Sequence, residues 1–272
     1  MDMQLRILTL LTLVFTVLLL KSCNNETDPK QSAPATKKID FLKKDASQYP
    51  DSASLHLRWA EELLTSGDTT GAVDVLLKFQ DKFPGNTGIL NGIGYTTLLA
   101  RDTPAAVFHI QNSLSINPNQ PEIEMELAFI FQSQKNDKWK EVVLNMIKDA
   151  KNQIRSSRGY FVRGVAESNE NQLDQAIHSF DSSILQQFTF VDAHIEKALL
   201  LLEKNKVSQA LDGIYKALEL DRKNPDIYFL AGECKRKLNE YESASNFYLQ
   251  ALELDPGHAG ARAKLHNIKK RN

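Results

Sequence analysis

The chain has 272 residues, of which 42% are hydrophobic and 25% are charged, and its formal net charge is -1. These values are ordinary for a folded globular protein and exclude a disordered or fibrous chain. A net charge this close to zero gives no field that would draw the chain to nucleic acid, so no nucleic-acid partner is expected. The two cysteines are too few for a disulfide framework.

Residues 1–22 are predicted to be a targeting segment. Ile7 to Leu20 is an apolar run of 14 residues broken only by threonines, which fits a secretory signal of about 7–15 residues better than a spanning helix of about 20. The run ends in Leu20-Lys21-Ser22-Cys23, which resembles the lipobox of bacterial lipoproteins. This resemblance implies cleavage before Cys23 and lipid attachment to its thiol. Because Lys21 departs from the lipobox pattern, an uncleaved signal-anchor helix and plain secretion stay open as alternatives.

The segment after the cysteine is predicted to be a flexible tether. Residues 23–36 are polar and show no apolar periodicity, as in chains that do not fold on their own. Residues 37–272 are predicted to form the folded domain. The resemblance to lipoproteins implies a cell-envelope location with the folded domain outside the cytoplasm. By analogy with enteric sorting rules, Asn24 after the cysteine favours the outer over the inner membrane.

Small residues recur through the folded part at intervals of 34 residues, with one interval of 36. One series is Ala60, Gly94, Ala128, Gly164, Ala198 and Gly232. A second series is Ala72, Ala106, Val142, Ala176, Ala210 and Ala244. Larger side chains follow in phase at Leu76, Ile110, Met146, Phe180, Ile214 and Tyr248. A fixed period of this length is typical of a repeat architecture.

The pattern resembles the tetratricopeptide repeat, a helix–turn–helix unit of 34 residues. The resemblance implies an all-α, right-handed superhelical solenoid of six repeats, which start near residues 53, 87, 121, 157, 191 and 225. Small residues at fixed places let neighbouring helices pack closely. Gly67, Asn171, Asn205 and Asn239 are expected in the turns inside the repeats, because both residue types tolerate a left-handed backbone. Residues 38–48 and 259–270 are predicted to form capping helices.

The third repeat departs from the period. It has two additional residues near 135–138, Val142 in place of alanine and Asp149 in place of a small residue. One interpretation is degeneracy that the array tolerates. The other is a local change of pitch that divides the array into an N-terminal and a C-terminal half.

In the tetratricopeptide family the first helix of each repeat lines a concave groove. The resemblance therefore implies a peptide-binding groove lined by Leu57, Tyr95, Met125, Phe129, Phe161, Val165, Ile195, Leu199 and Phe229. Charged residues bound this apolar stripe, with Glu61 at one end and Glu233 and Arg236 at the other. Exposed apolar surface of this kind typically binds a protein or peptide. The alternative is that these side chains pack against each other across neighbouring first helices. An acidic C-terminus is not the expected ligand, since only Asn91 matches the Lys and Asn residues of a carboxylate clamp.

No catalytic, metal or cofactor site is expected. None of the six histidines lies in an HExxH pair or at zinc-site spacing from a cysteine. The function hypothesis is a membrane-anchored protein-interaction scaffold of the bacterial cell envelope, not an enzyme. An adaptor that regulates an envelope protease or a cell-wall enzyme is the alternative. A carbohydrate-binding lipoprotein, or an enzyme with a site that the sequence does not reveal, is a third hypothesis.

Overall fold

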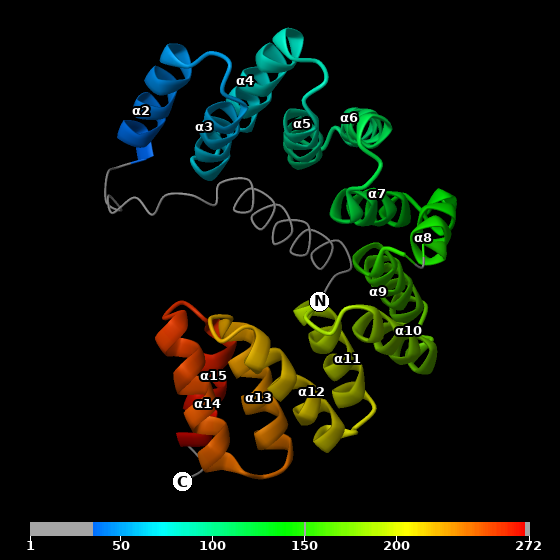
Figure 1. The fold of residues 1–272 in the computed structure, drawn as a ribbon. Helices are drawn as coiled ribbons and strands as arrows, with labels where there is room; N and C mark the ends of the chain where they lie inside the picture. Colours follow the sequence, from blue (N-terminus) through cyan, green and yellow to red (C-terminus); the bar gives the residue numbers. More distant parts are fainter. Residues whose placement is uncertain (1–34, 150, 270–272) are drawn as a thin grey trace. The chain divides into compact units, whose positions relative to one another are not determined.

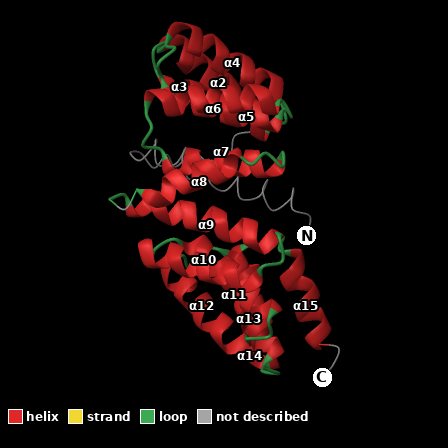
Figure 2. Cartoon of the chain, turned by 90° about the vertical axis from the view of Figure 1, so that its right-hand side faces the viewer, coloured by secondary structure: helices red, strands yellow, loops and turns green. Residues whose placement is uncertain are grey.

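The structure is a computed structural model that describes residues 35–149 and 151–269. Over these residues it contains 14 helices and no strand (Figure 1, Figure 2), which confirms the predicted all-α array of repeats. The predicted targeting segment and Cys23 lie outside the described residues. The predicted tether was expected to reach Thr36, whereas α2 already begins at Ala35.

The helices alternate as first and second helices of successive repeats. The first helices are α3 (Ala53–Thr65), α5 (Thr87–Leu99), α7 (Pro121–Ser133), α9 (Gln153–Asn169), α11 (Val191–Glu203) and α13 (Pro225–Lys237). The second helices are α4 (Thr69–Lys82), α6 (Thr103–Ile116), α8 (Lys138–Lys148), α10 (Leu173–Gln186), α12 (Val207–Leu220) and α14 (Tyr241–Leu254). Two further helices flank the six pairs, at the places expected for capping helices: α2 (Ala35–Gln48) and α15 (Ala259–Lys269).

The chain divides into two compact units, residues 1–142 and residues 143–272. We call them unit 1 and unit 2. The division falls inside α8, in the repeat that carries the additional residues and Val142. This position agrees with the interpretation that the irregular third repeat separates two halves of the array.

Each unit has its own hydrophobic clusters. In unit 1, one cluster joins α3, α4 and α5 around Leu57 and Leu76, and another joins α6 and α7 around Ile110. In unit 2, one cluster joins α11, α12 and α13 around Ile214, and another joins α14 and α15 around Tyr248. Full burial of one such side chain stabilises the fold by about 1.5–3 kcal/mol, so packing between neighbouring helices holds the repeats together.

The recurring glycines lie where the two helices of one repeat approach closely. A Cβ atom added at Gly164 would lie 2.8 Å from the ring of Phe180, and one added at Gly232 would lie 2.5 Å from the ring of Tyr248. Both rings are fully buried, so they have little room to move. The period therefore places glycine opposite each aromatic side chain because no larger residue fits there.

All six first helices end in the same backbone conformation. The second residue after each of these helices has a positive φ between 55° and 89°: Gly67, Arg101, Lys135, Asn171, Asn205 and Asn239. In the fourth repeat, the amide of Asn171 donates to the carbonyl of Ser168 at 3.0 Å, and the amide of Gln172 donates to that of Glu167 at 2.8 Å. This is the Schellman pattern, which satisfies the last carbonyls of a helix. The turn residues Arg101 and Lys135 were not predicted, because neither residue type favours a positive φ.

Replacement of Lys135 by glycine is expected to stabilise the chain by about 1 kcal/mol, because a left-handed backbone costs a residue with a side chain about 1–2 kcal/mol. The measurement is urea unfolding followed by circular dichroism. Lys78→Gly is the matched control, since Lys78 is exposed in the middle of α4 and its replacement should destabilise the chain by about 1 kcal/mol. A loss of stability in both variants would contradict the expected strain at Lys135.

The fourth repeat begins earlier than the spacing predicts. α9 starts at Gln153, four residues before the predicted start at Ser157. Asn152 caps this helix, because its side-chain oxygen accepts a hydrogen bond from the amide of Arg155 at 3.0 Å. As a result α9 has 17 residues, whereas α11 has 13.

Candidate functional site

The nine predicted groove residues all lie on first helices, but only some reach the surface. Five of them are buried, with at most 8% of the residue exposed: Leu57, Tyr95, Met125, Phe129 and Phe161. Leu57 belongs to the core cluster of α3, α4 and α5. Phe161 packs against the rings of Phe180 and Phe190, with centroid distances of 5.6 and 4.9 Å. Leu57 therefore packs against the neighbouring first helix α5, as the alternative expected. Phe161 instead packs against the second helix α10 and the residue before α11, not against another first helix.

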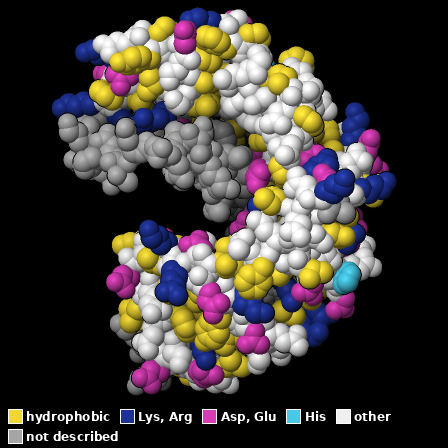
Figure 3. All heavy atoms as spheres, in the orientation of Figure 1, with side chains coloured by type: hydrophobic (Ala, Val, Ile, Leu, Met, Phe, Trp, Pro, Cys, Tyr) yellow, Lys and Arg dark blue, Asp and Glu magenta, His cyan; other side chains and the backbone are white. Residues whose placement is uncertain are grey.

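The other four predicted residues are partly exposed and all belong to unit 2: Val165, Ile195, Leu199 and Phe229. We call these four side chains the first-helix face of unit 2. Ile195 and Leu199 lie one turn apart on the same side of α11. Figure 3 shows that hydrophobic side chains gather over α11 to α13 on the visible side of unit 2, with acidic and basic side chains between them.

A polar cluster centred on Glu233 follows one turn after Phe229 on α13. Arg236 donates to both carboxylate oxygens of Glu233, from Nε at 3.1 Å and from Nη2 at 2.9 Å. Lys264 Nζ donates at 3.0 Å from α15, and the hydroxyl of Tyr248 donates at 2.5 Å from α14. Burial alone would raise the pKa of Glu233, but these hydrogen bonds lower it to about 2. Glu233 therefore stays ionised at neutral pH and fixes the positions of both cations.

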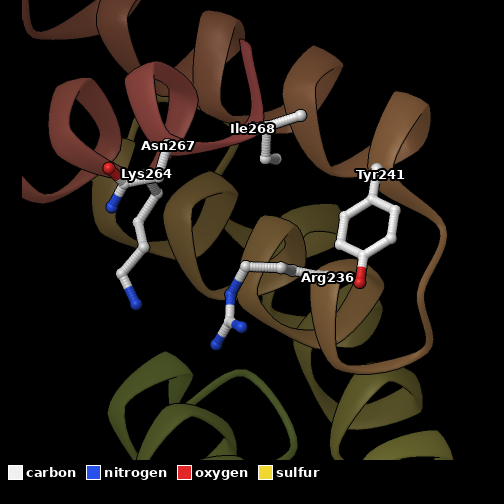
Figure 4. Close-up of a pocket in the computed structure, with 5 residues that line it drawn as sticks. All are labelled: Arg236, Tyr241, Lys264, Asn267 and Ile268. Atoms are coloured by element: carbon white, nitrogen blue, oxygen red, sulfur yellow. The ribbon is translucent and has the colours of Figure 1, made fainter. Parts of the chain in front are cut away.

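A small pocket of about 150 Å³ lies beside this cluster and is lined by Arg236, Tyr241, Lys264, Asn267 and Ile268 (Figure 4). The charged ends of Arg236 and Lys264 point to the same side. Both cations pair with the single carboxylate of Glu233, so the cluster keeps a net positive charge. Because guanidinium and ammonium groups offer several donors, the pocket can hold a carboxylate or carbonyl group. Its volume is below the roughly 300–1,000 Å³ of a typical small-molecule site, so it suits one side chain of a larger ligand.

The sequence predicted two of the charged residues in the polar cluster around Glu233. It placed Glu233 and Arg236 at the charged end of the groove, and the structure brings them together. It did not predict the part played by Lys264, because α15 was expected only to cap and solvate the array. Glu233 and Lys264 are 31 positions apart in the sequence, and stacking of the helices brings them together, which no local pattern reveals.

The described residues show few groups suited to catalysis. No set of three or more His, Cys, Asp or Glu side chains among them could hold a metal ion. Within the same residues, no helix has the length and apolar character needed to cross a membrane. Cys234 is buried, and burial raises the pKa of its thiol to about 11, so it remains a neutral thiol at physiological pH.

Comparison with known proteins supports the repeat fold. A family model of the tetratricopeptide repeat matches residues 225–258, which contain α13 and α14. The human protein O-mannosyl-transferase TMTC3 is 25% identical over 187 residues, which cover 64% of this chain and 20% of that protein. The mouse protein of the same name is 24% identical over 157 residues, covering 53% of this chain and 17% of that protein. The chain thus spans at most about a fifth of the length of the curated relatives it matches.

Solved structures with similar folds support the same architecture. Yeast Tom70 matches with a TM-score of 0.73 and 14% identity, over 85% of this chain and 49% of that chain. A tetratricopeptide repeat protein from Parabacteroides merdae ATCC 43184 matches with a TM-score of 0.59 and 16% identity, over 86% and 92% of the two chains. At these identities the likeness concerns the fold, and the chain contains tetratricopeptide repeats.

Proposed function

We propose that this chain is a membrane-anchored scaffold of the bacterial cell envelope, which binds a protein or peptide partner on the first-helix face of unit 2. Tetratricopeptide arrays typically bind proteins on such surfaces. The observation that supports the proposal most strongly is the partial exposure of Val165, Ile195, Leu199 and Phe229. The last of these apolar side chains, Phe229, lies one turn before the net positive cluster around Glu233. An apolar centre with a polar rim is the usual arrangement of a protein interface.

The anchoring part of the proposal rests on the sequence Leu20-Lys21-Ser22-Cys23. Labelled palmitate should enter the wild-type chain in bacterial cells but not the Cys23→Ala variant. Equal labelling of both proteins would contradict lipid attachment at Cys23. The curated relatives are named transferases, but the alignment covers only 20% of the human protein, so we do not extend that activity to this chain.

The binding part is tested by photo-cross-linking in cells. A diazirine amino acid placed at Leu199 should form an adduct with one partner protein. The same amino acid at Leu185 is the control, because Leu185 lies on the second helix α10 and is 84% exposed. We expect an adduct from Leu199 and none from Leu185, although Leu185 is the more accessible residue. Equal adducts at both positions, or an adduct at Leu185 alone, would move binding away from the first-helix face of unit 2.

A further inference from the structure

The carboxylate of Glu233 has no acceptor position left for the two cations beside it. Its Oε1 atom accepts from Arg236 Nε at 3.1 Å and from the Tyr248 hydroxyl at 2.5 Å. Its Oε2 atom accepts from Arg236 Nη2 at 2.9 Å and from Lys264 Nζ at 3.0 Å. An ionised carboxylate offers about four acceptor positions, so all of them are occupied. Any further acceptor for Arg236 and Lys264 has to come from another group.

Both cations keep unused donors. A guanidinium carries five N–H donors and an ammonium three, and Glu233 takes two from Arg236 and one from Lys264. The hydroxyl of Tyr248 is the other group that acts on Arg236. Within residues 35–149 and 151–269, at least two guanidinium donors and two ammonium donors therefore have no acceptor. The same cations carry one positive charge more than Glu233 neutralises.

The two cations line the pocket of about 150 Å³ described above (Figure 4). Their charged ends point to the same side, Arg236 from α13 and Lys264 from α15. Two other walls of the pocket are apolar, namely the buried side chain of Ile268 and the ring of Tyr241. A ligand group in this pocket would meet positive charge at one end and carbon atoms along its length.

We propose that this pocket binds the side-chain carboxylate of an aspartate or glutamate in the partner of unit 2. The inference rests on the proposed function, because it names the chemistry of that partner. A carboxylate supplies both the acceptors and the negative charge that Arg236 and Lys264 lack. Its methylene stem suits the apolar walls at Ile268 and Tyr241. A phosphate has no such stem, and the carboxylate at a chain end lies beside a polar backbone amide.

The position of the pocket predicts where the acidic residue stands in the partner. Phe229 belongs to the first-helix face of unit 2 and precedes Arg236 by seven residues on α13, which is about 10 Å along the helix axis. An extended peptide advances about 3.3 Å per residue. An apolar residue that contacts Phe229 should therefore be followed or preceded by the acidic residue at a distance of three positions.

The test uses the purified full chain and three labelled peptides of this spacing. Each peptide is acetyl-Leu-Leu-Ala-Ala-X-Ala-amide, in which X is glutamate, glutamine or lysine, and its affinity is measured by fluorescence anisotropy. The side chains of Arg236 and Lys264 are 34% and 37% exposed, so the charge pair is partly screened by solvent. We expect the glutamate peptide to bind about fivefold more tightly than the glutamine peptide. The lysine peptide should bind most weakly.

The Lys264→Gln variant should bind the glutamate peptide about fivefold more weakly than the wild type does, because the cluster loses its excess positive charge. Its affinity for the glutamine peptide should stay unchanged, whereas a purely structural role of Lys264 would weaken both peptides alike. Lys237→Gln is the matched control. Lys237 is exposed on α13 and does not line the pocket, so its loss removes the same charge and should keep the preference. Circular dichroism confirms that both variants fold.

A fourth peptide distinguishes a side chain from a chain end. It is the glutamine peptide with a free C-terminal carboxylate, and it should bind no more tightly than its amide. Binding as tight as that of the glutamate peptide would assign the pocket to a chain end and overturn the proposal. No preference for glutamate in the wild type, no binding of the glutamate peptide, or a preference that persists in Lys264→Gln would also overturn it.

This experiment and the cross-linking experiment fail independently. An adduct at Leu199 without any preference for glutamate would leave the proposed function intact and remove only the acidic-residue pocket. A preference for glutamate that depends on Lys264, with no adduct at Leu199, would support the pocket and argue against partner binding across the first-helix face of unit 2.

Discussion

Replacing Glu126 by glutamine is expected to stabilise the chain at pH 8 and to flatten the pH dependence of its unfolding between about pH 5 and pH 8. Burial and the charge of Glu122 raise the pKa of Glu126 from 4.5 to about 8. Between these two values the folded chain holds the proton while the unfolded chain releases it. The free energy of unfolding should therefore fall as the pH rises, by up to about 1.4 kcal/mol per pH unit. Glutamine is neutral throughout and removes this contribution.

The measurement is urea unfolding of the wild type and of Glu126→Gln at several pH values across this range. Glu141→Gln is the control, because Glu141 is an exposed carboxyl on α8 and its loss should leave the slope nearly unchanged. The same slope in the wild type and in Glu126→Gln would show that Glu126 does not hold a proton in the folded chain.

Replacing Phe180 by alanine is expected to lower the free energy of unfolding by about 3–5 kcal/mol, the usual range for a buried phenylalanine. Phe180 is 0% exposed, its ring centroid lies 5.6 Å from that of Phe161, and it fills the space opposite Gly164. Its removal leaves a cavity between α9 and α10, because the backbones are already close at the glycine. Since each repeat depends on its neighbours, we expect the loss to destabilise unit 2 as a whole.

Leu185→Ala on the same helix is the matched control for Phe180→Ala. Leu185 is 84% exposed, so its truncation should change the free energy of unfolding by less than about 0.5 kcal/mol. Urea unfolding of both variants gives the comparison. Losses of similar size would mean that the phased aromatic residues do not hold the repeats together.

The repeat fold could be predicted from the sequence because its physical cause is periodic. Glycine at 164 and 232 is required by the neighbouring rings of Phe180 and Tyr248, and the same place holds glycine or alanine in every repeat. The positive φ in the turn after each first helix is equally periodic. At Arg101 and Lys135 the surrounding helices impose this conformation, and these residue types give no sign of it. The early start of α9 depends on the local cap at Asn152, outside the periodic places.

The candidate site could be predicted only in part. The family pattern assigns both Phe161 and Leu199 to the groove, yet Phe161 is buried against Phe190 whereas Leu199 stays partly exposed. This difference depends on which side chains neighbouring helices supply, so a single repeat does not reveal it. Lys264 lies outside the places that the groove pattern marks, and its approach to Glu233 becomes visible only when hydrogen bonds between helices are known.

The measurement that most directly tests whether unit 2 binds a partner is the affinity of the protein captured through Leu199 for three purified chains. These are the wild type, the Ile195→Ser/Leu199→Ser variant and the Leu185→Ser control. We predict that the double variant binds at least about tenfold more weakly, because it loses two apolar contacts of about 1 kcal/mol or more each, and that the control binds as the wild type does. Equal affinities for all three chains would contradict a partner site on the first-helix face of unit 2.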